Sequence, residues 1–241
     1  MARDEIYREL PGDRDFRFDA TVAAVFDDML ERSVPGYRQV IAMTGAILTR
    51  YLAPGDLVYD LGCSTGTTLL ELAGCLNAPG LRFVGLDNSP AMLAKARRKA
   101  GLPGLSAQVE FWEADITATR LEPAGAVLMN YTLQFVAPDR RQDFLHTVYQ
   151  ALRPGGVLIL SEKTVATDSK LDQTYLEFYL DFKRANGYSE TEIARKRQAL
   201  EKVLIPFSLA DNLRMLTAAG FAKVEPFHQW FNFASIMAVK E

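Results

Sequence analysis

The sequence predicts an α/β fold built on a seven-stranded, mostly parallel sheet that ends in an antiparallel hairpin. Apolar, β-branched runs recur along the 241 residues and alternate with segments of helical length, as the βαβ units of a parallel sheet require. Near the carboxyl end, two further apolar runs are separated only by a short turn at 231–232, which predicts the hairpin at the sheet edge. Hydrophobic residues make up 49% of the chain, so a substantial core can be buried.

The expected parallel strands, in chain order, are residues 56–62, 81–87, 107–115, 124–130 and 155–162. Helical patterns flank them, as an N-terminal helical cap at about 17–51 and a long helical insert at about 165–217. Both additions are expected over the carboxyl ends of the strands, where open α/β sheets bind their ligands. We therefore expect a single ligand-binding domain that spans residues 1–241.

The composition disfavours several classes of protein. The first residues, "MARDEIYRELPGDRDFRFD", are charged throughout, unlike a secretory signal, and no apolar run approaches the roughly 20 residues that cross a bilayer. Two cysteines and two histidines are a poor metal-binding set, and Cys63 and Cys75 suit small buried thiols in a reducing cytoplasm. The net charge of −3 argues against nucleic acid as the main partner.

A glycine-rich turn follows the first expected strand in "VYDLGCSTGTTLLELA". Gly62 and Gly66 permit a tight turn and a close backbone approach to a ligand, and the next helix begins with oriented N–H groups. Their G-x-x-x-G spacing differs from the G-x-G-x-x-G of dinucleotide sites. Asp60, just before the turn, would repel a pyrophosphate but suits a cationic ligand, so NAD is disfavoured.

Acidic residues also stand at the tips of the second and third strands. Asp87 is placed to accept hydrogen bonds from both hydroxyls of a ribose. Asp115 can accept from an exocyclic adenine amine, with Ile116 against the ring. One such acid alone is more often a helix cap or a turn residue. The ordered set of Asp60, Asp87 and Asp115, however, matches the S-adenosylmethionine site of the Rossmann-like class I methyltransferase fold.

Methyl transfer is the usual reaction of that fold, but its specialised motifs are absent. The stretch "NYTLQF" lacks the prolines found in amino-methylating enzymes, and no cysteine occupies the position expected of a pyrimidine-methylating nucleophile. His146 lies in an expected helix and His228 in the terminal hairpin. We therefore identify no side chain as a general base.

Six stretches carry a more specific signal than the cofactor fold. They are "FDDMLERSVPGY" (26–37), "VYDLGCS" (58–64), "DNSPAM" (87–92), "NYTLQF" (130–135), "LSEK" (160–163) and "DFKRANGYSE" (181–190). Together they resemble the carboxy-S-adenosyl-L-methionine synthase family, and the resemblance extends from about residue 15 to the end of the chain. The family often has a small or apolar residue where Thr65 and Thr67 stand, and a phenylalanine in place of Tyr131.

The resemblance implies a reaction other than methyl transfer. In the family, prephenate loses its carboxylate and hydroxide to give phenylpyruvate, and a sulfonium ylide of S-adenosyl-L-methionine captures the released CO2. The hydroxide takes the proton, which agrees with the absence of an identified base. The product, carboxy-S-adenosyl-L-methionine, is then used by a tRNA carboxymethyltransferase to modify a wobble uridine derivative. The resemblance further implies a homodimer. From the composition we expect a cytoplasmic protein that binds neither nucleic acid nor membranes.

Two alternatives stay open at this point. The chain could be a conventional S-adenosylmethionine-dependent methyltransferase that acts on a small molecule or tRNA. It could also be a non-catalytic S-adenosylmethionine-binding partner of a tRNA-modification enzyme.

The resemblance also implies a set of cofactor-binding residues. They are Tyr37, Gly62, Cys63, Ser64, Asp87, Asn88, Asp115, Ile116 and Asn130. Gly62, Asp87 and Asp115 are also expected at the site from the residues alone, whereas Tyr37 is not.

The stretch "DFKRANGYSETEIARKRQ" (181–198) is unusually basic for an acidic chain. Its "SETE" segment is a capping box, so a helix is expected from about Glu190. A helical wheel places Arg197 inside the apolar face, Lys196 at its margin and Arg195 on the solvated side. The resemblance aligns Arg197 with the arginine that binds the carboxylate of the modified cofactor, in its own subunit or in a second one, which makes it the predicted catalytic residue. The basic residues expected to be solvated or to form dimer contacts are Lys183, Arg184 and Arg195.

Overall fold

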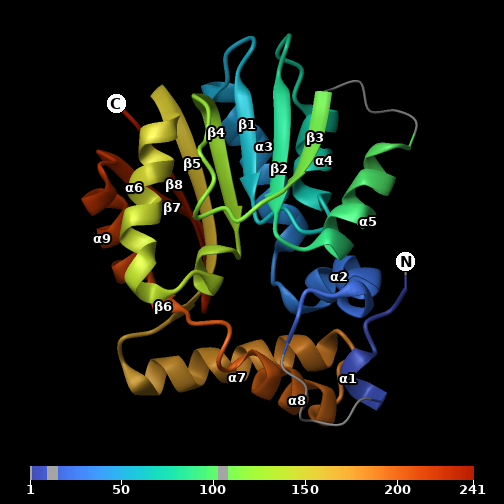
Figure 1. Ribbon diagram of the computed structural model, residues 1–241. Coiled ribbons are helices and arrows are strands. Elements are labelled where there is room, and N and C mark those ends of the chain that lie inside the picture. Colours follow the sequence, from blue (N-terminus) through green and yellow to red (C-terminus); the bar gives the residue numbers. More distant parts are fainter. Residues whose placement is uncertain (1, 10–15, 103–107) are drawn as a thin grey trace.

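The structure is a computed structural model that describes residues 2–9, 16–102 and 108–241 (Figure 1). Helices cover both faces of a central sheet, and a further helical layer crosses the carboxyl ends of its strands. The strand order is β3-β2-β1-β4-β5-β8-β7, and a short β6 pairs with β5. The strands are β1 (Leu57–Leu61), β2 (Arg82–Asp87), β3 (Gln108–Glu113), β4 (Ala124–Asn130), β5 (Leu152–Val165), β6 (Phe207–Ser208), β7 (Lys223–Trp230) and β8 (Phe233–Val239).

The strand pairing confirms the predicted sheet. Strands β1 to β5 pair in parallel, and β8 pairs antiparallel with both β5 and β7. Every residue of β1 is buried because helices cover both faces, which explains the uninterrupted apolar runs in the sequence. Strand β5 is longer than expected, since it begins at Leu152 and continues to Val165. Residue 107, the expected start of the third strand, lies outside the described residues.

Two groups of helices cover the sheet. Helices α6 and α9 pack on one face through Phe144 and Leu216, and α3, α4 and α5 pack on the other through Leu48, Leu72 and Leu93. The helices are α1 (Ile6–Glu9), α2 (Ala20–Ser33), α3 (Tyr37–Tyr51), α4 (Thr67–Cys75), α5 (Pro90–Ala100), α6 (Arg141–Ala151), α7 (Ser169–Ala185), α8 (Glu190–Leu200) and α9 (Leu209–Ala219). Across the described ranges, none of them has the length and apolar character of a membrane span.

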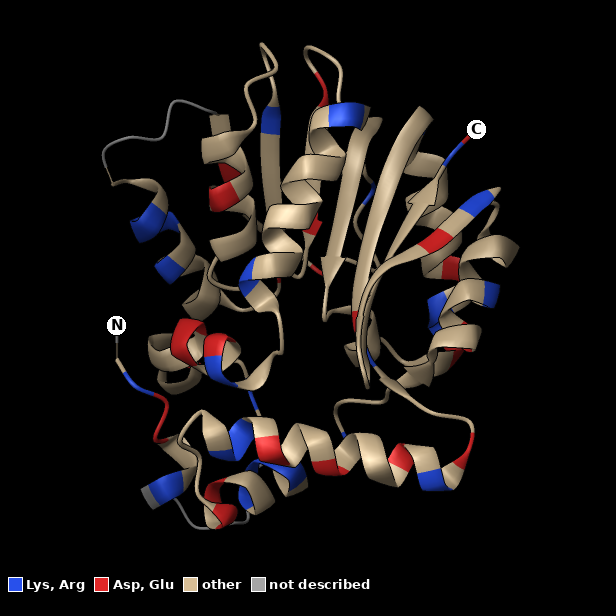
Figure 2. Ribbon diagram, turned by 180° about the vertical axis from the view of Figure 1, so that it is seen from behind, with Lys and Arg blue, Asp and Glu red and all other residues tan. Residues whose placement is uncertain are grey.

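Helices α1, α7 and α8 form the layer at the carboxyl ends of the strands, and α2 lies between this layer and α5 (Figure 1). Helix α8 begins at Glu190 with the expected capping box, in which the side chains of Ser189 and Glu192 bond reciprocally to the backbone. Figure 2 shows acidic and basic residues intermixed along α7. Helix α9 falls inside the insert expected at 165–217, but it packs on the sheet face because Leu216 joins the core there.

Candidate functional site

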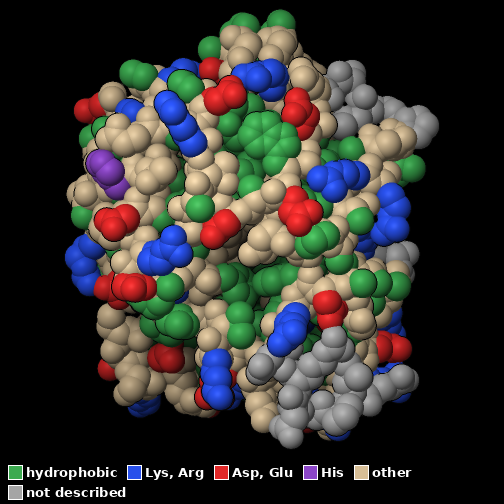
Figure 3. All heavy atoms as spheres, in the orientation of Figure 1, with side chains coloured by type: hydrophobic (Ala, Val, Ile, Leu, Met, Phe, Trp, Pro, Cys, Tyr) green, Lys and Arg blue, Asp and Glu red, His purple; other side chains and the backbone are tan. Residues whose placement is uncertain are grey.

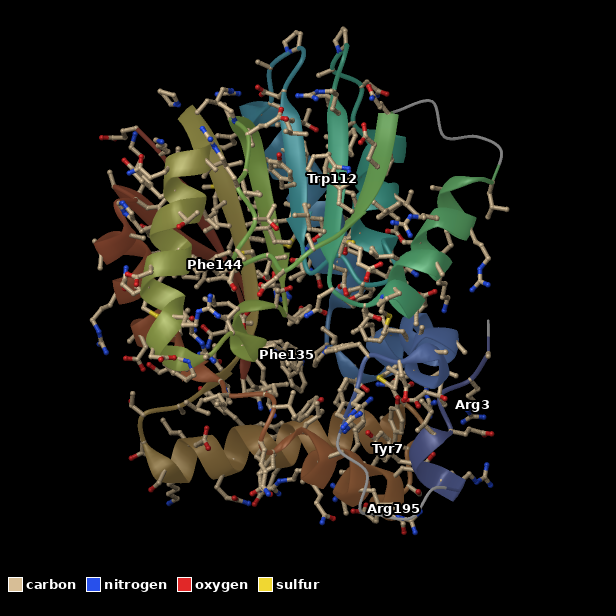
Figure 4. All side chains as sticks on the ribbon, viewed as in Figure 1. Arg3, Tyr7, Trp112, Phe135, Phe144 and Arg195 are labelled. Atoms are coloured by element: carbon tan, nitrogen blue, oxygen red, sulfur yellow. The ribbon has the colours of Figure 1, made fainter. Side chains whose placement is uncertain are left out.

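A cavity of about 460 Å³ opens between the carboxyl ends of the strands and the helical layer. The ends of β1, β2, β4 and β5, with the loops that follow them, form one side of it, and residues of α2, α7 and α8 form the other. Figure 3 shows hydrophobic side chains in a recess between these two layers. Figure 4 places Phe135, which lines the cavity, in the space between the sheet and α7.

The glycine-rich turn after β1 forms part of the cavity wall. Gly62 and Gly66 have φ angles of 79° and 71°, in the left-handed region that favours glycine. A Cβ atom on Gly62 would lie 2.5 Å from the side chain of Thr132, and one on Gly66 would lie 2.8 Å from Phe111. The G-x-x-x-G spacing therefore reflects two positions where a side chain has neither the backbone conformation nor the space.

Asp87 connects the tip of β2 to this turn. Its carboxylate accepts hydrogen bonds from the backbone N–H of Ser64 at 2.9 Å and of Ser89 at 2.8 Å. Burial raises the pKa of Asp87, although these backbone bonds act in the opposite direction. The carboxylate is thus held at a fixed place on the cavity wall, where its remaining lone pairs can accept hydrogen bonds from a ligand.

Two acceptors in the cavity wall have no donor. The side chain of Asp60 is buried, and no described residue donates a hydrogen bond to its carboxylate. Burial, with the charge of Asp87 as a second cause, raises the pKa of Asp60 to about 7. The Oδ1 atom of Asn130 is also buried without a hydrogen-bond partner among the described residues. Buried acceptors of this kind suit a ligand that brings positive charge and N–H groups, as S-adenosylmethionine does.

Asp115 follows β3 and is more exposed. Its Oδ1 accepts hydrogen bonds from both the backbone N–H and the hydroxyl of Thr117, at 2.8 and 2.7 Å, and these bonds lower the pKa of Asp115. Its Oδ2 has no donor among the described residues, so one oxygen of an ionised carboxylate is left to accept a hydrogen bond. Asp115 lines the cavity together with the partly buried Ile116. This pair suits an adenine, which offers an exocyclic amine and an apolar face.

All nine residues predicted to contact the cofactor line this cavity. Tyr37 could not have been placed here from the residues alone, because it comes from α3 rather than from a strand end. Its ring is buried and its hydroxyl bonds to Thr68, and burial raises its pKa. The two histidines lie elsewhere: His146 contacts the carbonyl of Ala219, and neither His146 nor His228 lines the cavity.

The predicted orientation of Arg197 is wrong for the single chain. Its side chain is exposed and is not part of the cavity wall, whereas Lys196 is buried, lines the cavity and pairs with Asp4 at 3.4 Å. The helical wheel assumed that α8 continues through Leu204, but the helix ends at Leu200 and a turn follows. The buried face of α8 therefore includes Ile193, Lys196 and Ala199, and Arg197 lies outside it.

A second correction concerns Lys183, which was expected to be solvated or to form a dimer contact. Its side chain is buried, and its ammonium lies 5.4 Å from the centroid of the Tyr179 ring. Burial, with the charges of nearby lysines, lowers the pKa of Lys183 to about 7. Arg184 is exposed as expected and pairs with Glu190 at 2.5 Å. Arg195 is half-buried, because it donates to the carbonyl of Tyr7 at 3.0 Å (Figure 4).

Thr65 and Thr67, which also line the cavity, belong to a polar cluster at the glycine-rich turn. Thr65 and Thr67 both donate hydrogen bonds to the buried carboxylate of Asp27 on α2. Lys95 and Lys99 of α5 pair with the same carboxylate at 3.0 and 3.2 Å. Burial alone would raise the pKa of Asp27, but these partners lower it overall. The cluster thus ties the turn to α2 and α5.

Three other residues that line the cavity were not predicted from the sequence. Lys163 lies near the end of β5, Tyr179 lies on α7, and Tyr131 comes directly after β4 with a φ of 60°. A lysine that ends a buried, apolar strand in "LSEK" is the one signal that could have indicated such a residue.

Comparisons with known proteins agree with this geometry. A family model described as a methyltransferase domain matches residues 58–156. Curated relatives named carboxy-S-adenosyl-L-methionine synthase include one from Desulfotalea psychrophila, which is 49% identical over 99% of this chain and 97% of its own length. Another, from Methylococcus capsulatus, is 45% identical over 100% of both chains, and one from Nitratiruptor sp. is 42% identical over 100% of this chain and 99% of its own.

Solved structures share the fold at low identity. Human N-acetylserotonin methyltransferase in complex with S-adenosylmethionine superposes with a TM-score of 0.62 and 16% identity, covering 92% of this chain and 55% of that one. Magnesium protoporphyrin IX methyltransferase from Synechocystis, with bound S-adenosylhomocysteine, gives a TM-score of 0.62 and 19% identity over 88% and 87% of the two chains. These similarities confirm the class I methyltransferase fold.

Proposed function

This chain belongs to the carboxy-S-adenosyl-L-methionine synthase family, and we propose that it converts S-adenosyl-L-methionine and prephenate to carboxy-S-adenosyl-L-methionine and phenylpyruvate. In the proposed reaction, prephenate releases CO2 and hydroxide and becomes phenylpyruvate. The CO2 forms a carbon–carbon bond to the sulfonium methyl carbon, and the hydroxide leaves as water with the methyl proton. A tRNA carboxymethyltransferase would then use the product to modify a wobble uridine, and the enzyme would act as a cytoplasmic homodimer.

The extent of the similarity carries this proposal. The methyltransferase family model ends at residue 156, but the similarity to the synthases continues through α7 and α8 to the end of the chain. Those helices close the cavity opposite the glycine-rich turn, where a second substrate has to meet the methyl group. Specificity for an unusual co-substrate is most easily built there, since the strand ends are shared by the whole fold.

The cavity residues fit this assignment. Asp87 would accept hydrogen bonds from the ribose hydroxyls and Asp115 from the adenine amine. Asp60 and Asn130 would face the cationic methionine part, whose sulfonium methyl is the group that is carboxylated. Because hydroxide released from prephenate takes the proton, the reaction requires no imidazole in the cavity wall.

Arg197 enters the proposal through the resemblance, as the residue that binds the new carboxylate. Its planar guanidinium can hold a carboxylate through two parallel hydrogen bonds. In the single chain it is exposed. Burial lowers the pKa of Lys163, and the charge of Arg197 nearby adds to that effect. Arg197 would therefore reach a carboxylate at the edge of its own cavity or, in a homodimer, the cavity of a second subunit.

Subunit mixing separates these two arrangements. Asp60→Asn and Arg197→Lys subunits, each impaired alone, are refolded together. Activity recovers in the mixture if Arg197 acts across the interface, because one cavity of each mixed dimer is then intact. It does not recover if Arg197 acts within its own subunit.

The proposed reaction is tested by incubating the protein with methyl-deuterated S-adenosyl-L-methionine and prephenate, followed by mass spectrometry. The expected result is a cofactor peak that has gained one CO2 and lost one methyl deuterium, together with phenylpyruvate. Formation of S-adenosylhomocysteine and a methylated acceptor would instead establish a conventional methyltransferase. Binding of S-adenosyl-L-methionine without turnover of prephenate would favour the non-catalytic partner.

A further inference from the structure

Two lysines beside the cavity have no anionic partner. Lys163 lines the cavity at the end of β5, and Lys183 is buried one helical turn beyond Tyr179 on α7. Within the described ranges, neither ammonium group forms an ion pair or donates a hydrogen bond. Both lie near the Tyr179 ring instead, at 4.9 Å for Lys163 and 5.4 Å for Lys183 from its centroid. Lys163 is half-buried and Lys183 is buried, and cations withdrawn from water without an anion are costly, so this arrangement is incomplete without one.

The nearby charges do not compensate these lysines. The charge of Asp4 also acts on Lys183, but the Asp4 carboxylate is paired with Lys196 at 3.4 Å, and Lys196 donates to the hydroxyl of Ser33 at 3.2 Å. Asp172 acts on Lys163 only at a distance and accepts the backbone N–H of Ala166. The charge of Arg197 adds to the positive side.

Glu162, the neighbour of Lys163 in sequence, does not neutralise it either. Its two carboxylate oxygens accept the backbone N–H groups of Leu133 and Gln134, both at 2.9 Å. Successive residues of a strand point to opposite sides, so the side chains of Glu162 and Lys163 diverge. This part of the cavity therefore carries an excess of positive charge.

Two hydroxyl groups accompany the lysines. Tyr131 and Tyr179 both line the cavity, and neither hydroxyl has a hydrogen-bond partner among the described residues. Burial raises the pKa of both, so each remains an O–H donor. An ammonium and two phenolic donors that converge from β5, the loop after β4 and α7 form the donor set that a carboxylate accepts from.

We infer that Lys163, with the hydroxyls of Tyr131 and Tyr179 and the supporting charge of Lys183, binds a carboxylate of the second, acidic substrate. The inference rests on the proposed function for the identity of that acid. It assigns this carboxylate to a place distinct from that of Arg197, which is outside the cavity wall in the single chain. A dicarboxylic acid would thus be held by one carboxylate while the other is lost as CO2.

The test uses Lys163→Met, which keeps the length of the side chain and removes its charge. Lys163→Arg restores a cation, and Lys170→Met, on the exposed start of α7, is the matched control. Prephenate is titrated calorimetrically into each protein saturated with S-adenosylhomocysteine, which has no methyl group to carboxylate. The Kd for prephenate should weaken about 10- to 100-fold in Lys163→Met, the range for loss of a charge-assisted hydrogen bond, and recover in part in Lys163→Arg.

Two further measurements separate the possible outcomes. The Kd for S-adenosyl-L-methionine should change by less than about twofold; if it weakens as much as that for prephenate, the lysine holds the methionine carboxylate and the inference is overturned. Unchanged prephenate binding in Lys163→Met would also overturn it. Because these titrations need no turnover, they judge the subsite even if the wild-type protein fails to carboxylate S-adenosyl-L-methionine, a result that would refute the proposed function alone.

Discussion

Binding of S-adenosyl-L-methionine should strengthen as the pH rises through about 7, because Asp60 loses its proton in that range. Burial and the neighbouring charge of Asp87 raise the pKa of Asp60 from 3.8 to about 7. The ionised carboxylate attracts the positive charge of the ligand, and the neutral acid does not. A group with this pKa is about 10% ionised at pH 6 and about 90% ionised at pH 8. If the ionised form alone binds, the Kd falls about tenfold between these two values.

Asp60→Asn tests this reasoning, since it preserves the shape of the side chain and removes its charge. At pH 8 the variant should bind about 10- to 100-fold more weakly than wild type, and at pH 6 the difference should shrink by about tenfold. The other titratable groups that face Asp60 are Asp87, Tyr37 and Cys63, and they are unchanged in the variant. The amino group of the ligand also titrates near pH 8, equally for both proteins.

Isothermal titration calorimetry at half-unit pH steps from 6 to 8 gives the two profiles. Asp143→Asn, on the exposed surface of α6, is the control and should follow wild type at every pH. Parallel profiles for wild type and Asp60→Asn would refute the reasoning, because the pH dependence would then come from another group. A variant that binds as tightly as wild type at pH 8 would remove Asp60 from the binding site.

Three further predictions concern stability and catalysis. Gly62→Ala should lower the free energy of unfolding by about 2–4 kcal/mol in urea titrations, because its Cβ would lie 2.5 Å from the side chain of Thr132. Gly55→Ala is the control: its φ is 81° but the space around it is open, so it should lower the free energy of unfolding by only about 1–2 kcal/mol. Asp27→Ala should cost about 3 kcal/mol by the same assay at pH 7, since it leaves two lysines without their carboxylate. Because its folded pKa is lowered, the stabilisation by Asp27 is complete above the unfolded value of 3.8 and is lost as the pH falls through the folded value, so the wild-type and variant curves should converge in acid. Arg197→Lys should reduce the kcat for carboxylation at least about tenfold and leave the Kd for S-adenosyl-L-methionine within about twofold; normal turnover would contradict its assigned role.

The sheet and one edge of the site could be predicted from sequence because they depend on short, periodic patterns of residues along the chain. Buried parallel strands produce apolar runs, and the carboxyl ends of such strands meet at one edge. The positions of Asp60, Asp87 and Asp115 at three strand tips therefore implied that they surround one ligand, and all three line the cavity. The glycine spacing was equally informative, since it recorded backbone conformations that other residues rarely adopt.

The helical side of the cavity could not be predicted in the same way. Whether Lys196 is buried depends on Asp4, which lies 192 positions away in the chain, and on the exact end of α8 at Leu200. A helical wheel contains neither piece of information. Lys183 was likewise assigned to solvent because lysine is usually exposed, whereas here it is buried near the ring of Tyr179. Both errors thus concern charged residues, and for Lys196 the burial depends on a partner that is distant in sequence.

The distribution of charge across the cavity bears on the choice between carboxylation and methyl transfer. The wall formed by β1 and β4 presents Asp60 and the unpaired oxygen of Asn130, which suit a cation. The wall formed by β5 and α7 presents Lys163 beside Tyr179, which suits an anion. A neutral methyl acceptor would leave the second wall uncompensated, whereas the acidic co-substrate of the proposed reaction would supply the missing negative charge. The two halves of the cavity are therefore complementary to a cationic and an anionic substrate bound together.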